Sequence, residues 1–215
     1  MGNVKRILCY GDSNTFGYIP GRGGRYNRHT RWPGLLSDLL GEGFLVVEEG
    51  LCGRTTMFDD MTDPGRSGLE TMEAAIKKRS PLDLLIVMLG SNDCKLQFQA
   101  SAKEIAEGVG QVIERAKSCG AGEFHVLLIA PAAMTGRIMQ SGFGSEFNLR
   151  SVEVSGELAG EYEALAERLD CHFLDASKVT RVSETDGLHL DEQGHRLLAE
   201  AVCAWAKKDY TGEKV

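Results

Sequence analysis

The stretch "LLIVMLGSND", residues 84–93, decides the fold. Residues 84–89 are apolar without alternation, which is the pattern of a strand buried on both faces of a parallel sheet. Gly90 ends this run, and the polar residues Ser91, Asn92 and Asp93 follow. In helix-covered parallel sheets, sites form beyond the carboxyl ends of the strands. The stretch therefore predicts a central strand followed by a segment of a candidate site.

Other apolar runs of strand length surround this one and alternate with helical patterns. The predicted strands lie near residues 4–10, 44–48, 82–89, 124–130 and 171–175. The predicted helices cover residues 32–40, closed by Gly41, and then about 68–79, 101–118, 149–170 and 192–208. This alternation favours an α/β protein, a flavodoxin-like three-layer α/β/α sandwich with a five-stranded parallel sheet. Residues 1–215 are long enough for one well-packed domain, and we expect a single one.

Composition narrows the function classes. The formal net charge of -7 argues against a general nucleic-acid binder or a protein of anionic membrane surfaces. No apolar run approaches the roughly 18 residues that a membrane span needs. The first residues, "MGNVKRILCYGDSN", contain no apolar core or cleavage site of a signal peptide. We therefore expect a cytoplasmic protein without nucleic-acid or membrane partners.

The six cysteines show no metal-binding or disulfide pattern. None forms a C-x-x-C pair or alternates with histidines at metal-ligand spacing. Free thiols in a reducing cytosol are the expected state. The cysteines are Cys9, Cys52, Cys94, Cys119, Cys171 and Cys203.

A serine follows the first apolar run, in "YGDSNTFGY", residues 10–18. Ser13 is either a turn residue or a nucleophile, and a serine nucleophile needs a base. His189 lies after the last strand, on the same rim of the sheet, three residues beyond Asp186. An acid at that spacing can accept the Nδ1 proton and hold Nε2 toward the serine. Asp175, at the end of the fifth strand, is the rival acid.

The other four histidines fit structural or surface positions better. Two flank or enter predicted strands, one lies in the last helix and one lies in a polar loop. They are His125, His172, His195 and His29.

A serine that attacks a carbonyl group also needs donors for the developing oxyanion. Gly53, in a turn after the second strand, and the amide of Asn92 are candidates, with the Ser13 backbone N–H as a third. Taken singly, such residues are typical of turns and helix caps. The functional interpretation rests on four segments that reach one edge of the sheet in compatible roles.

Together these segments resemble the four blocks of the SGNH (GDSL-type) hydrolases. The blocks are Gly11-Asp12-Ser13, Gly53, Gly90-x-Asn92-Asp93 and Asp186-x-x-His189, in the usual order. The chain looks most like the bacterial arylesterase/acyltransferase branch. The supporting phrases are "RILCYGDSNTFGYIP", "EEGLCGRTTMFDDMTDP", "PLDLLIVMLGSNDCK" and "TDGLHL". The likeness spans nearly the whole chain and is weakest between residues 131 and 170.

The resemblance implies a serine esterase for short, often acetyl, esters, which in some members also passes the acyl group to alcohols. It implies Ser13 as nucleophile, His189 as base and Asp186 as orienting acid. It further implies an oxyanion hole of Ser13, Gly53 and Asn92, no metal or organic cofactor, a small-molecule ester as partner, and a homo-oligomer. By the same resemblance, the residues that shape the substrate pocket are Asp12, Phe16, Lys95 and Leu188.

The chain departs from the family pattern near the nucleophile. Asn14 replaces the usual leucine, and Phe16 stands where tryptophan is common. Cys52-Gly53 stands where members of the family often carry other small residues. These changes leave the expected catalytic set intact but can alter the acyl pocket.

Alternative functions remain at this stage. The same triad could serve a carbohydrate acetylesterase or an acyl-thioesterase. A phosphate- or nucleotide-binding module is disfavoured, because the motif G-x-x-x-x-G-K-[ST] is absent. An α/β-hydrolase is disfavoured as well, because it needs a G-x-S-x-G elbow and Ser13 lacks one. A scaffold that merely retains the motif is a further alternative.

The long irregular stretch 131–148 either packs on its own domain or forms a lid or subunit contact.

Overall fold

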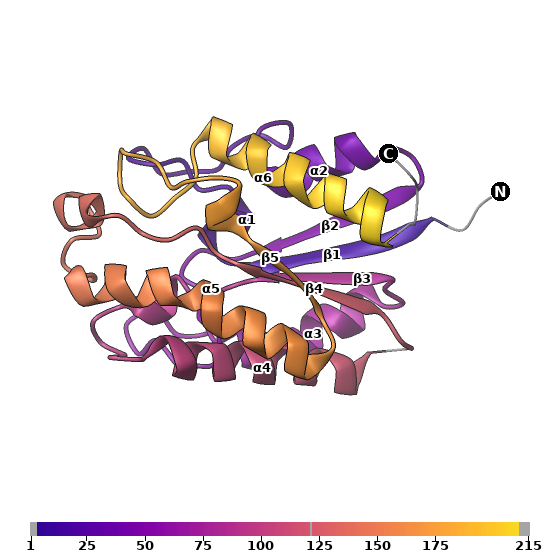
Figure 1. Cartoon of the computed structure of the whole chain (residues 1–215), viewed down its shortest axis with the longest axis horizontal. Coiled ribbons are helices and arrows are strands. Elements are labelled where there is room, and N and C mark those ends of the chain that lie inside the picture. The colour runs from indigo at the N-terminus through magenta and orange to yellow at the C-terminus, as the bar shows by residue number, and fades with distance from the viewer. Residues whose placement is uncertain (1–3, 121, 211–215) are drawn as a thin grey trace.

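A computed structural model describes residues 4–120 and 122–210. One parallel sheet with strand order β2-β1-β3-β4-β5 forms its centre, as the alternating pattern predicted (Figure 1). Each strand lies within two residues of its predicted bounds. The strands are β1 (Lys5–Gly11), β2 (Phe44–Gly50), β3 (Leu84–Met88), β4 (His125–Ala130) and β5 (His172–Asp175).

Helices cover both faces of the sheet, which confirms the three-layer sandwich. In Figure 1, α2 (Trp32–Leu40) and α6 (Glu192–Trp205) lie on one face. The other face carries α3 (Gly68–Arg79), α4 (Ala102–Cys119) and α5 (Leu149–Leu169). The predicted helix 192–208 is α-helical only to Trp205, where α6 ends, and continues as a π-helical turn at Ala206–Tyr210.

The uniform apolar sequence of β3 has a direct physical cause. Successive side chains of a strand point to opposite faces. Leu85 and Val87 join the core beneath α3, α4 and α5, whereas Leu84, Ile86 and Met88 join the core beneath α2 and α6. All five side chains are buried, so a polar residue at any of these positions would have to give up its hydration.

Strand register places the polar segments at a common edge. Gly11, the last residue of β1, pairs with Gly50 of β2 and with Met88 of β3. The three strands therefore end level with one another. The segments that follow them, which begin at Asp12, Leu51 and Leu89, emerge side by side.

Short helical segments that periodicity did not predict follow several of the strands. The four-residue helix α1 (Ser13–Phe16) follows β1, and 3₁₀ turns follow β3 and β5. These turns are η1 (Asn92–Cys94) and η3 (Ala176–Lys178). Segments of three or four residues are much shorter than the window of about 11–18 residues in which helical periodicity can be recognised, so hydrophobic spacing cannot detect them.

The stretch 131–148 is more ordered than its irregular composition suggested. It contains the 3₁₀ turn η2 (Gly136–Gln140). Its apolar side chains Met134, Ile138 and Phe147 are buried in the core beneath α5. This packing on its own domain is one of the two arrangements considered for the stretch. Phe143 packs against the same core and also contacts His189 in the site described next.

Candidate active site

Ser13 begins helix α1 directly after β1. Asp12 is the N-cap, and its Oδ1 accepts a hydrogen bond from Asn14 N–H at 2.9 Å. Gly17 ends the helix after a single turn, in the left-handed conformation. The serine is therefore held at the edge of the sheet with only 6% of its surface exposed.

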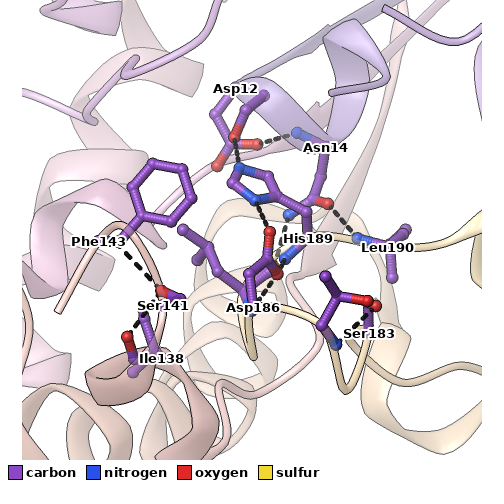
Figure 2. Close-up of polar contacts among 12 residues, drawn as sticks. Asp12, Asn14, Ile138, Ser141, Phe143, Ser183, Asp186, His189 and Leu190 are labelled. Atoms are coloured by element: carbon purple, nitrogen blue, oxygen red, sulfur yellow. Dashed lines mark hydrogen bonds and ion pairs between the residues drawn. The ribbon is translucent and has the colours of Figure 1, made fainter. Parts of the chain in front are cut away.

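Asp186 and His189 come together within one turn of the chain (Figure 2). His189 Nδ1 lies 2.8 Å from Asp186 Oδ2, and the backbone N–H groups of Leu188 and His189 donate to Asp186 Oδ1 at 3.0 and 2.9 Å. Burial by itself raises the pKa of Asp186. The hydrogen bonds from His189 and Leu188 outweigh burial and hold this pKa below its ordinary value.

The other ring nitrogen of His189 reaches the serine. His189 Nε2 lies 3.0 Å from Ser13 Oγ, across 176 positions of sequence. This is the distance at which an imidazole can take a hydroxyl proton. Asp175, the rival acid, instead accepts a hydrogen bond from Ser177 N–H at 2.9 Å and caps η3. The structure thus connects Asp186, His189 and Ser13 in a chain of hydrogen bonds.

The three expected oxyanion donors surround the same cavity of about 320 Å³. Gly53 adopts φ +78°, a conformation that suits glycine best. Among the described residues, no group accepts a hydrogen bond from the backbone N–H of Ser13 or Gly53. Asn92 Nδ2 donates to the Arg54 carbonyl oxygen at 3.1 Å, which fixes the orientation of this amide. Ser13, Gly53 and Asn92 all line the cavity.

The four residues expected to shape the pocket divide into two groups. Lys95 and Leu188 line the cavity with Ser13, whereas Asp12 and Phe16 are not among the lining residues. Asp12 is buried and caps the helix that begins at Ser13. Phe16 instead packs beneath Arg25, whose guanidinium carbon lies 4.6 Å from the ring centre.

Charged side chains meet at the wall of the cavity. Lys95 Nζ lies 3.1 Å from Asp60 Oδ2 and 2.9 Å from Glu146 Oε2. Burial lowers the pKa of Lys95, but the two carboxylates raise it by more, so the net shift is upward. Through Glu146, this ion pair fastens the 131–148 stretch to the rim of the site.

Two aromatic rings that contact each other also contact His189, and the sequence had not assigned either of them to the site. The Tyr18 ring centre lies 4.3 Å from that of His189, and the Phe143 ring centre lies 5.2 Å away. Both residues line the cavity. Tyr18 belongs to the nucleophile motif, so its place near Ser13 could have been inferred. Phe143 comes from the distant stretch 131–148, whose length suggested a lid or subunit contact, but no sequence pattern points to Phe143 itself.

Arg54 was also missed, although it directly follows Gly53. Its Nη1 donates to the carbonyl oxygens of Gly11 and Glu49, and its guanidinium carbon lies 4.0 Å from the Tyr10 ring centre. A buried cation of this kind fixes the Gly53 turn against the ends of β1 and β2. The polar character of arginine gave no hint that it would be buried, because arginine is usually exposed.

Two buried carboxyl groups lie beneath the site. Asp93 Oδ1 accepts hydrogen bonds from Thr56 N–H and Thr56 Oγ1, while Asp93 Oδ2 has no partner among the described residues. Burial raises the pKa of Asp93 to about 7. Asp12 also has a partnerless Oδ2, and burial raises its pKa to about 6. Asp93 and Asp12 therefore hold their protons more tightly than exposed aspartates do.

His195 has a structural position, as its place in the last helix suggested. Its side chain is fully buried, and Nδ1 accepts a hydrogen bond from Trp32 N–H at 3.3 Å. Burial lowers the pKa of His195 to about 3. A neutral His195 joins the start of α2 to α6.

Two further features concern metals and membranes. Across residues 4–120 and 122–210, no group of three or more His, Cys, Asp or Glu side chains could hold a metal ion. No helix in the same part of the chain is both long enough and apolar enough to cross a membrane.

Comparison with known proteins identifies the family. Residues 9–197 match the GDSL-like lipase/acylhydrolase family. The chain therefore belongs to this family of esterase-like hydrolases, which confirms the resemblance noted in its sequence. A comparison with curated proteins gave no match.

Solved structures of bacterial esterases are similar to the chain. The M. smegmatis aryl esterase is 34% identical, with a TM-score of 0.89, and the match covers 95% of this chain and 99% of that one. Its inhibitor-bound form gives the same values. A carbohydrate acetylesterase from Sinorhizobium meliloti is also 34% identical, with a TM-score of 0.84 and coverage of 93% and 97%.

Proposed function

We propose that the protein is a serine esterase that hydrolyses short-chain, acetyl-type carboxylic esters. The observation that carries this proposal is the hydrogen-bonded series Asp186–His189–Ser13 at the wall of a cavity that Gly53 and Asn92 also line. Similarity to aryl esterases and a carbohydrate acetylesterase supports the same reaction class.

In the first half-reaction, His189 Nε2 takes the Ser13 hydroxyl proton while Oγ attacks the ester carbonyl. The negative charge that develops on the carbonyl oxygen is stabilised by the N–H groups of Ser13 and Gly53 and the amide of Asn92. The bond to the leaving alcohol then breaks, and His189 gives its proton to that alcohol. Ser13 is left as an acyl ester.

In the second half-reaction, His189 takes a proton from water as the water oxygen attacks the acyl carbonyl. The bond between the acyl group and Ser13 Oγ breaks, and the proton returns to Ser13. An alcohol that replaces water at this step would accept the acyl group instead, which is the acyltransferase reaction. Asp186 stabilises the imidazolium that forms twice in each cycle.

A carbohydrate acetylesterase is the second candidate, because the cavity carries polar groups suited to sugar hydroxyls. Thr62, Asp63, Lys95 and Glu146 are among its lining residues. Hydroxyl, carboxylate and ammonium groups can all hydrogen-bond to a sugar. An acyl-thioester substrate finds no comparable support. The homo-oligomer implied by the resemblance stays a prediction.

The test is a series of p-nitrophenyl esters, from acetate to octanoate, given to wild type and Ser13→Ala. We expect wild-type turnover to fall steeply with acyl length and Ser13→Ala to lose at least about 10⁴-fold in kcat. Acetylated sugars in the same assay separate the two candidates. Mass spectrometry after phosphonate treatment should locate the label on Ser13. A folded Ser13→Ala variant with wild-type turnover would contradict the mechanism.

A further inference from the structure

Asn14 joins the serine turn to the histidine loop. Its side-chain Nδ2 donates to the Leu188 carbonyl oxygen at 3.3 Å, and its Oδ1 accepts from Leu190 N–H at 2.9 Å. Figure 2 shows the amide of Asn14 beside Leu190 and His189. One carboxamide thus pairs with the backbone on both sides of His189, as a neighbouring β-strand would.

The internal bonds of the histidine loop do not set its distance from the serine. His189 is fixed to Asp186 by the bonds described above, and Ser183 N–H donates to the His189 carbonyl oxygen at 2.7 Å. All these groups belong to the same segment, 183–189. They orient the imidazole within the loop and would move with the loop as one body.

Among the described residues, three hydrogen bonds connect the serine turn (residues 12–16) with residues 183–190. One joins Ser13 Oγ to His189 Nε2, and this bond is lost each time Ser13 carries an acyl group. The other two belong to Asn14 and do not involve reacting atoms. During the acyl-enzyme stage, they are the hydrogen bonds that still hold His189 against the serine turn.

We propose that Asn14 is a positioning residue that keeps His189 in place after Ser13 has been acylated, and so supports deacylation. This inference rests on the proposed function and adds a specific step to it. The usual leucine after the motif serine could make neither hydrogen bond. Asn14 is 5% exposed and does not line the cavity, so its side chain is not expected to contact substrate.

The kinetic signature follows from the affected step. When deacylation is slowed selectively, kcat and KM fall together and kcat/KM is nearly unchanged, because kcat/KM reports acylation. For Asn14→Leu we expect kcat on p-nitrophenyl acetate to fall about 10–100-fold, the range for a displaced catalytic group. Rapid mixing should show a burst that approaches one equivalent of p-nitrophenol, larger than that of wild type.

Two companion variants make the test specific. Asn14→Asp has nearly the same shape and keeps the acceptor for Leu190 N–H, but its carboxylate has no donor and sets an oxygen against the Leu188 carbonyl oxygen. Deacylation should slow in this variant too. Ser155→Ala is the matched control. Ser155 Oγ is likewise buried, accepts from Met134 N–H and donates to the Val152 carbonyl, and does not line the cavity. We expect it to lose stability without any new burst.

The outcomes separate the inference from the proposed function. Unchanged kinetics in folded Asn14→Leu or Asn14→Asp would overturn the positioning role. Equal losses in kcat and kcat/KM without a burst would overturn it as well, because they would place the defect in acylation. Different results would contradict the proposed function: a wild-type protein that turns over no ester, or a Ser13→Ala variant that keeps full turnover.

Discussion

The carboxylate of Asp186 receives two hydrogen bonds from His189, one on each oxygen. Oδ2 lies 2.8 Å from the ring Nδ1, and Oδ1 accepts from the His189 backbone N–H at 2.9 Å. A carboxylate bound in this way favours the tautomer with its proton on Nδ1. Nε2 is then free to accept the proton of Ser13, 3.0 Å away.

Asp186→Asn should therefore impair turnover far more than substrate binding. The variant amide can donate to Nδ1 and so favours the wrong tautomer, and it cannot stabilise an imidazolium. We expect kcat for p-nitrophenyl acetate to fall by about 10³–10⁴-fold while KM changes little. Steady-state kinetics at saturating ester would measure the loss.

Asp175→Asn is the matched control, because Asp175 was the rival acid and caps η3 instead. Its kcat should stay within about twofold of wild type. A larger loss in Asp175→Asn than in Asp186→Asn would reverse the assignment of the acid.

Asp93 should make stability depend on pH in a particular direction. Its folded pKa is raised to about 7 by burial, whereas the unfolded chain ionises near pH 4. Between these values the unfolded state binds fewer protons, so a rise in pH favours unfolding. The contribution of Asp93 to the free energy of unfolding should fall by up to about 1.4 kcal/mol per pH unit in this window.

Asp93→Asn tests this dependence because its amide oxygen can still accept from Thr56 and carries no titrating proton. Urea unfolding between pH 4.5 and 7.5 should give a flatter profile for the variant than for wild type. Glu107→Gln, at an exposed position on α4, should leave the wild-type slope unchanged. Parallel profiles for Asp93→Asn and wild type would show that Asp93 does not titrate in this range.

Gly187→Ala should disturb the stretch 131–148. Gly187 has φ +69°, and a Cβ there would lie 2.6 Å from Ile138 N and 2.8 Å from Thr135 Oγ1. Its carbonyl oxygen also accepts from Thr135 N–H at 3.0 Å. The added methyl group must push η2 away from the histidine loop. We expect a loss of about 2–4 kcal/mol in the free energy of unfolding, together with a lower kcat.

Gly24→Ala separates the clash from backbone strain. Gly24 has φ +79°, and a Cβ there would meet no atom within 4 Å. Only the conformational cost of about 1 kcal/mol should remain, with kcat unchanged. If Gly187→Ala and Gly24→Ala were equally destabilised, the clash between residue 187 and η2 would add nothing to the cost of the backbone conformation.

The sequence by itself determined those features that depend on short-range constraints. Burial on both faces forces every side chain of β3 to be apolar, so residues 84–88 could be recognised without a structure. The spacing of Asp186 and His189 allows one turn to bring them together, since both belong to the same loop. Ser13, Gly53 and Asn92 follow strands of a parallel sheet, and topology places such segments at one edge.

Tertiary structure alone decided the contacts between distant segments. Phe143 reaches His189 from the 131–148 stretch, and Asn14 bonds to Leu188 across 174 positions. The choice of Asp186 over Asp175 depended equally on where the two loops turn. Periodicity and spacing report which face of an element is buried and which neighbours share a turn. They carry no information on which loop closes against which, because that is set by the packing of the whole chain.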